Sequence, residues 1–189
     1  MKKIKKILIT VIAFTMVFTL AACGGGNSEE TDGKEFSSAE ELLKAVYDGF
    51  DGEYKFPVAG GSSDNMNEEG PGAFNVGDGS ELNQMMHFPS EYTEKIEDAA
   101  TMFHLMNANT FSAGAYRIKG DLNEITDAYT AEIDSTKWMC GFPEVFVVIK
   151  AGDYMIGAFG DSDLMDEFVK QAESRIANTK VIVNHPVSQ

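Results

Sequence analysis

Two kinds of hydrophobic pattern alternate along the second half of the chain. Glu144–Lys150 is a short run rich in β-branched and aromatic residues, a composition that favours a strand, and Phe111–Ile118 also predicts a strand. Between these runs, the apolar residues of Asp121–Ile133 recur every three or four positions, which predicts a helix with one apolar face. This region therefore begins with a strand, a helix and a second strand.

The pattern continues towards the C-terminus. The tight turn 151–153 predicts that Tyr154–Phe159 returns as the hairpin partner of the strand before it. A helix that begins at Asp161 or Ser162 follows, and 181–183 predicts a last short strand. From about 111 to 184 this is the split βαβ, or ferredoxin-like, order. We expect an α+β fold, in which the helices pack on one face of an antiparallel sheet.

The segments before residue 111 add elements to this core. Ala99–Met106 predicts an extra strand, and 37–50 predicts an N-terminal helix whose first turn has capping-box spacing. Short helical patterns follow at 82–86 and 90–98. The stretch at about 52–80 is rich in Gly, Asn and acidic residues and predicts a loop. We expect a single domain over 36–189.

The N-terminus has the three parts of a secretory signal. Four lysines lie within the first six residues, an uncharged and mostly apolar stretch follows at 7–20, and Leu20-Ala21-Ala22-Cys23 forms a small-residue cleavage site. The apolar stretch is shorter than the roughly 20 residues that a membrane span needs. An ordinary secretory signal and an uncleaved anchor helix are the alternative interpretations.

Leu20-Ala21-Ala22-Cys23 resembles the bacterial lipobox at all four positions. The resemblance implies removal of a signal peptide (1–22), S-diacylglycerol on Cys23 and an N-acyl group such as palmitate on its new amino group. A single acyl chain gives only marginal membrane binding, which is consistent with more than one chain. We therefore expect a protein on the extracytoplasmic side of the cell membrane, with 23–35 as a flexible tether that reaches on the order of 20 Å.

Charge narrows the classes of partner. The chain has 15 basic and 30 acidic residues, a net charge of −15. Because four of the lysines and none of the acids lie in the signal peptide, the mature chain carries 11 basic residues and a net charge of −19. Such a surface repels nucleic acid, so the expected partners are the membrane, through the anchor, and an unknown protein or small molecule.

The C-terminal half also resembles a family of uncharacterised Gram-positive lipoproteins that carry domain of unknown function 4358. The resemblance covers roughly 92–174. It rests on residues 99–103, on 114–119, on the helix at 121–133 and on the hairpin at 145–156. It implies a compact α+β domain on the cell envelope and brings no catalytic residues to carry over.

Candidate chemistry is sparse, and we predict no catalytic residues, cofactor or metal site. The acidic stretch from Asp48 to Glu81 is the best place to look for calcium, but its spacing breaks the EF-hand register, which favours a solvated loop. The three histidines, His87, His104 and His185, lack zinc-site spacing. Cys140 has no second free cysteine in the chain if Cys23 is lipidated, so we interpret it as a small buried apolar residue.

Motifs for nucleophilic catalysis and phosphate binding are absent from the sequence. No Gly-x-Ser-x-Gly elbow or P-loop pattern occurs, and Gly60-Gly61-Ser62-Ser63 predicts only a flexible loop. The methionines fit core positions better than soft-metal sites. We therefore expect a non-catalytic binding or interaction module, and keep as the alternative an envelope enzyme whose site is assembled from separated acidic residues.

Overall fold

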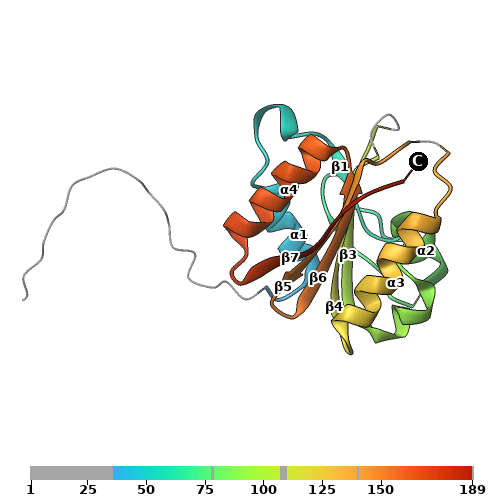
Figure 1. The fold of residues 1–189 in the computed structure, drawn as a ribbon. Helices are drawn as coiled ribbons and strands as arrows, with labels where there is room; N and C mark the ends of the chain where they lie inside the picture. The colour runs from blue at the N-terminus through green and yellow to red at the C-terminus, as the bar shows by residue number, and fades with distance from the viewer. Residues whose placement is uncertain (1–35, 78, 107–109, 140, 189) are drawn as a thin grey trace, which may run out of the picture. The chain divides into compact units, whose positions relative to one another are not determined.

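The computed structural model describes residues 36–77, 79–106, 110–139 and 141–188, which belong to one compact unit at Thr31–Gln189. These residues form four α-helices and a seven-stranded sheet in which every strand pair is antiparallel (Figure 1). The predicted α+β class is therefore confirmed. Within the described ranges, no helix is long and apolar enough to cross a lipid bilayer.

The elements follow one another with short connections. The α-helices are α1 (Ala39–Tyr47), α2 (Gly79–Met86), α3 (Leu122–Ser135) and α4 (Ser162–Arg175), with 3₁₀ turns η1 (Gly52–Tyr54) and η2 (Ser90–Lys95). The strands are β1 (Val58–Ala59), β2 (Gly72–Ala73), β3 (Ile96–His104), β4 (Ser112–Ile118), β5 (Val145–Ala151), β6 (Tyr154–Gly160) and β7 (Thr179–Pro186).

Most predicted elements lie where the pattern placed them, and two differ. The helical candidate at 90–98 is only a 3₁₀ turn, and β3 already begins at Ile96 because Ile96 and Ala99 pack into the core. β7 spans eight residues rather than three, since pairing with β5 extends it. The predicted start of α1 is confirmed: the Ser38 hydroxyl accepts a hydrogen bond from the Glu41 backbone N–H at 3.1 Å.

The strand order differs from the ferredoxin-like prediction at its last strand. The order is β1-β3-β4-β6-β5-β7, with β2 also paired to β3. β4, α3 and β5 form a split βαβ unit, because β6 lies between the two parallel strands. In the ferredoxin-like order the last strand would lie beside β4, but β3 occupies that edge, so β7 pairs with β5 instead.

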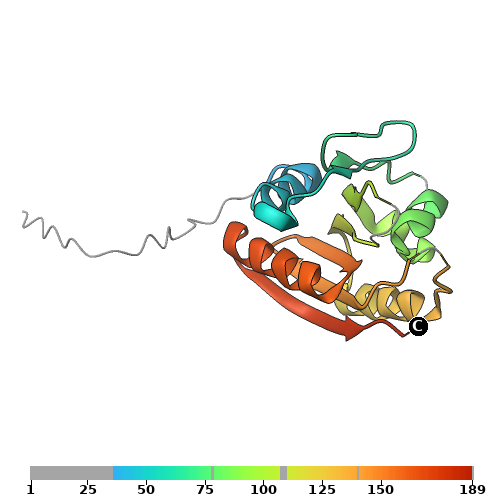
Figure 2. The ribbon, with the colours of Figure 1, turned by 90° about the horizontal axis from the view of Figure 1, so that it is seen from above.

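The helices cover both faces of the sheet, so the prediction that they pack on one face is wrong. α1 and α4 pack against one face, and α2 and α3 against the other (Figures 1 and 2). The crossovers β4–α3–β5 and β6–α4–β7 move across the sheet in the same direction, but they start from antiparallel strands. Since such crossovers are almost always right-handed, their helices must lie on opposite faces.

Two glycines make room for the second face. Gly114 and Gly157 lie opposite each other on β4 and β6. A Cβ at Gly157 would collide with the ring of Tyr129 on α3, and a Cβ at Gly114 would collide with the hydroxyl of Tyr116. Both tyrosines are fully buried. Gly157 therefore lets α3, with its large Tyr129 side chain, lie close to the strands, and Gly114 leaves room for the Tyr116 hydroxyl.

The stretch predicted as a Gly- and acid-rich loop contributes to one edge of the sheet. β1 and β2 each add two residues along β3. The segment between them is held by Thr101, whose hydroxyl accepts a hydrogen bond from the Gly61 N–H at 2.9 Å, and by the buried Ser62, whose hydroxyl accepts one from the Asn75 N–H. Gly60-Gly61-Ser62-Ser63 is therefore a fixed part of the edge rather than only a flexible loop.

Candidate functional site

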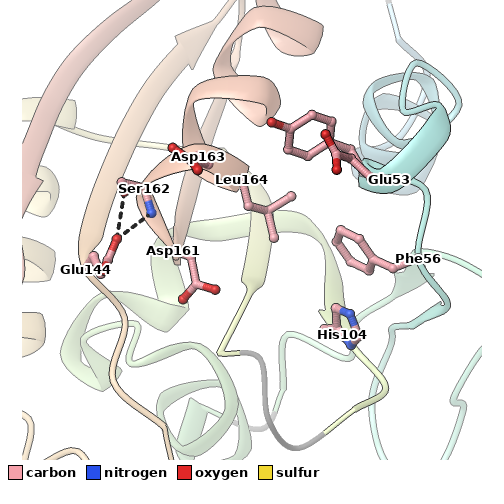
Figure 3. Close-up of a pocket in the computed structure, with 9 residues that line it drawn as sticks. Glu53, Phe56, His104, Glu144, Asp161, Ser162, Asp163 and Leu164 are labelled. Atoms are coloured by element: carbon pink, nitrogen blue, oxygen red, sulfur yellow. Dashed lines mark hydrogen bonds between the residues drawn. The ribbon is translucent and has the colours of Figure 1, made fainter.

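An open pocket of ≈ 580 Å³ lies at one end of the sheet, beside the start of α4 (Figure 3). We call this the distal end, because β3 ends here at His104 whereas the first residues of α1 contact Asp98 near its other, proximal end. The pocket is lined by residues of η1 and its C-terminal flank, of β3, of the residue before β5 and of the start of α4. These are Glu53, Tyr54, Phe56, His104, Glu144, Asp161, Ser162, Asp163 and Leu164.

The start of α4 has an unusual cap. Asp161 occupies the N-cap position, but its side chain makes no capping hydrogen bond. Glu144 takes that role: its carboxylate accepts hydrogen bonds from the Ser162 backbone N–H at 3.0 Å and from the Ser162 hydroxyl at 2.7 Å. The Asp161 carboxylate is thereby released from the helix and points into the pocket between Glu144 and His104 (Figure 3).

These hydrogen bonds fix the charge of Glu144. The hydroxyl and the backbone N–H of Ser162 both favour the ionised carboxylate and lower the Glu144 pKa below its ordinary value. The positive end of the helix dipole acts in the same direction. Glu144 is therefore an ionised structural cap as well as part of the pocket wall.

On the wall of the pocket that faces Glu144, two contacts hold the His104 ring. Its ring stacks on the ring of Phe56 with a centroid distance of 4.3 Å and an interplanar angle of 15°. Its Nδ1 accepts a hydrogen bond from the Met106 backbone N–H at 2.9 Å. Partial burial lowers the His104 pKa, against the opposing charge of Asp161. In the neutral ring the proton is therefore on Nε2, which makes that nitrogen a hydrogen-bond donor.

The pocket wall has one sign of charge. Glu53, Glu144, Asp161 and Asp163 supply four carboxylates, and no Lys or Arg is among the nine lining residues. Tyr54, Phe56 and His104 add ring surfaces. Carboxylates beside aromatic rings favour an organic cation, which gains both charge attraction and contact with the ring faces.

The structure brings together few of the residues considered from sequence. Cys23 and Cys140 lie outside the described residues, as does Asp78 of the acidic stretch. From that stretch, Glu53 reaches the pocket, while Glu81 accepts a hydrogen bond from the Ser63 N–H on the other side of the sheet edge. In the described part of the chain, no group of three or more His, Cys, Asp or Glu side chains could hold a metal ion.

The three histidines lie in separate surroundings. His104 lines the pocket, whereas His87 packs edge-on against Trp138 on the α3 side of the sheet, where burial lowers its pKa. His185 on β7 contacts the Asp134 carboxylate at 2.8 Å. The methionines differ in how far they are buried. Among the described residues most fill the core, as Met102 and Met155 do, but Met66 is exposed between β1 and β2, and Met106 and Met139 are exposed at the distal end.

Sequence reasoning missed the pocket itself, although one signal was present. Val145 and Gly160 are paired ends of the β5–β6 hairpin, so Glu144 and Asp161, the next residues outward, must lie near each other. The predicted hairpin could have shown this. Phe56 and His104 could not be placed in the same way, because β1 is only two residues long and its pairing with β3 depends on tertiary packing.

The proximal end has a polar cluster of a different kind. The Asp98 carboxylate accepts hydrogen bonds from the Ala39 backbone N–H at 2.7 Å and from the Tyr154 hydroxyl at 3.2 Å. The Arg117 guanidinium donates to the Tyr154 hydroxyl and, at 3.2 Å, to the Ser37 carbonyl. This cluster fastens the first residues of α1 to β3, β4 and β6.

Comparisons with protein-family models, with curated proteins and with solved structures found no match to this chain. The pocket geometry therefore carries the functional argument.

Proposed function

We propose that the chain is an extracytoplasmic lipoprotein, held to the cell membrane by a lipid on Cys23, and that its domain is a non-catalytic binding module. The ligand places a cationic group in the distal pocket. One observation carries this proposal: four carboxylates and the rings of Tyr54, Phe56 and His104 line an open pocket that has no Lys or Arg in its wall. The lipobox resemblance supports the location, and the resemblance to the uncharacterised lipoprotein family adds no activity.

The freed Asp161 is the residue on which ligand binding most depends. The cap geometry leaves its carboxylate available, and the Nε2 donor of His104 on the facing wall can bind an acceptor atom of the same ligand. A guanidinium group suits this arrangement better than an ammonium group, because it is planar and can both pair with a carboxylate and stack on a ring. Arginine amide is therefore the simplest probe.

The proposal is tested by titrating arginine amide into the full-length lipidated protein in nanodiscs, with glutamine amide as the neutral control. Asp161→Asn should weaken arginine amide binding about tenfold, since a hydrogen bond to a charged group contributes roughly 1.5 kcal/mol. The matched control is Asp153→Asn, which removes an exposed Asp from the β5–β6 turn at the proximal end. Equal affinities of the two variants for arginine amide would refute the proposal.

An envelope enzyme is the second candidate, and one observation favours it: the pocket unites Glu53, Glu144, Asp161 and Asp163 from distant positions in the chain. Glu144 does not fit the role of general acid in such an enzyme. A general acid at neutral pH needs a raised pKa, whereas hydrogen bonds from Ser162 lower that of Glu144. An enzyme would show turnover that Asp161→Asn or Asp163→Asn abolishes while the ligand still binds.

A further inference from the structure

Large exposed apolar side chains gather at the distal end. Of the five such side chains in the described residues, four lie there: Leu105, Met106, Met139 and Phe142, with 45%, 62%, 84% and 54% of their surface exposed. The fifth, Met66, lies in the segment between β1 and β2. We call the four the apolar rim. Single exposed apolar residues are ordinary on protein surfaces, but a group of them beside a pocket marks an interaction site.

The apolar rim comes from two loops that touch. Leu105 and Met106 follow β3, and Met139 and Phe142 precede β5. The loops are in close contact, because a Cβ at Gly141 would collide with the side chain of Thr110. The two loops that carry the four side chains therefore meet at the distal end.

Members of the apolar rim adjoin pocket-lining residues along the chain. Leu105 directly follows His104, and the Met106 backbone N–H holds the His104 ring in place. Phe142 lies two residues before Glu144. A ligand that contacts the carboxylates of the pocket and extends beyond it would meet these apolar side chains. A small free cation would fill the pocket and leave them in water.

Charge selects the kind of partner. A bilayer containing anionic lipid would be repelled by the four carboxylates beside the rim, and a second copy of the chain would bring the same carboxylates face to face. The first residues of α1, which follow the proposed anchor in the chain, are fastened at the proximal end instead. A polypeptide that combines a basic side chain with apolar neighbours satisfies both the pocket and the rim.

We infer that the ligand is a segment of a partner protein, in which one arginine side chain enters the distal pocket and flanking apolar side chains pack on the apolar rim. This inference rests on the proposed function. Methionine suits such a surface, since its flexible side chain adapts to differently shaped apolar partners. The arginine gives orientation and attraction, and the apolar contacts give most of the added affinity.

The test uses full-length lipidated protein in nanodiscs and three capped pentapeptides: Ala-Leu-Arg-Phe-Ala, Ala-Ser-Arg-Ser-Ala and Ala-Leu-Glu-Phe-Ala, with arginine amide for comparison. We expect the first peptide to bind at least about tenfold more tightly than the second, since burial of two apolar side chains outweighs the polar replacements. The peptide with Glu should bind more weakly than either, because the carboxylates of the pocket repel it.

Substitutions in the apolar rim test whether its side chains contact the peptide, and thermal unfolding shows whether each variant still folds. Met139→Ser and Phe142→Ser should each reduce the advantage of the apolar peptide several-fold without changing affinity for arginine amide. Met66→Ser is the matched control, because Met66 is an exposed methionine that neither lines the pocket nor belongs to the apolar rim, so its removal should change neither affinity. A variant that unfolds is replaced by Met106→Ser, which removes a third member of the rim.

The outcomes distinguish failure of the inference from failure of the proposed function. If Asp161→Asn weakens arginine amide binding but apolar flanks and rim variants have no effect, the pocket binds a cation and the inference is wrong. If Asp161→Asn changes no affinity, the proposed function fails as well. Rim-dependent binding to vesicles of phosphatidylglycerol, without peptide binding, would also overturn the inference, because the rim would then contact lipid.

Discussion

The two ends of the sheet use charged side chains in opposite ways. At the proximal end, Asp98, Arg117 and Tyr154 bind one another and the backbone of Ser37 and Ala39, so the polar groups of this cluster are largely used within the fold. At the distal end, Glu144 satisfies the α4 cap, and Asp161 is left facing the pocket. The difference shows which charges stabilise the domain and which are available to a ligand.

The largest expected effect concerns the proposed lipid anchor on Cys23. Cys23→Ala should remove lipid labelling and release the protein from the membrane, since the acyl chains supply the anchoring free energy. Palmitate labelling and fractionation of cells measure both effects. A variant that remained on the membrane without a lipid would contradict the lipoprotein proposal and favour an uncleaved anchor helix.

The second largest effect is expected in the polar cluster of Asp98, Arg117 and Tyr154 at the proximal end. Asp98→Ala should lower the free energy of unfolding by about 1–3 kcal/mol, because it removes the acceptor of the Ala39 N–H and of the Tyr154 hydroxyl. Urea unfolding followed by circular dichroism measures this. A change no larger than that of a surface substitution would mean that the cluster does not fasten α1.

The corresponding substitution at the distal end, Asp161→Asn, should change the free energy of unfolding far less than Asp98→Ala. Asp161→Asn is expected to alter the free energy of unfolding by less than about 0.5 kcal/mol, as for other surface substitutions. The weaker attraction to the helix dipole is offset by less repulsion from Glu144 and Asp163. The same unfolding experiment applies. If Asp161→Asn destabilised the domain as much as Asp98→Ala, the contrast between the two ends would be lost.

The smallest effect is a pH dependence at Glu144. Because its folded pKa is lowered, ionised Glu144 contributes stability that is fully present above its ordinary value of 4.5 and is lost as pH falls through the lower folded value. The difference in melting temperature between wild type and Glu144→Gln should therefore be present at pH 7 and shrink below pH 4.5. A difference that grew on acidification would contradict the capping role.

The sequence predicted the order of elements well, because each is encoded locally. The strand at Val145–Ala151 and the amphipathic α3 and α4 appear in the hydrophobic pattern itself. The face on which each helix packs depends on strand order, which is a tertiary property. The pattern could not show that β3 would occupy the edge of β4 and direct β7 to the other side of the sheet.

The candidate site was predictable only in part, for the same reason. Glu144 and Asp161 flank one hairpin, so their proximity follows from local pairing. The stacking of His104 on Phe56 requires β1 to pair with the end of β3, which no periodicity in the sequence encodes. The exchange of capping roles between Asp161 and Glu144 is likewise visible only in three dimensions, although a helix start near Asp161 was predicted.

Site-specific photo-crosslinking in cells tests the central contrast most directly. A photoreactive amino acid is placed at Met139 at the distal end or at Asp153 at the proximal end, both exposed positions. We predict a discrete crosslinked product from position 139 that disappears when Asp161→Asn is added, and no such product from position 153. A product from position 153 alone, or one from position 139 that persists with Asp161→Asn, would contradict the assignment of binding to the distal pocket.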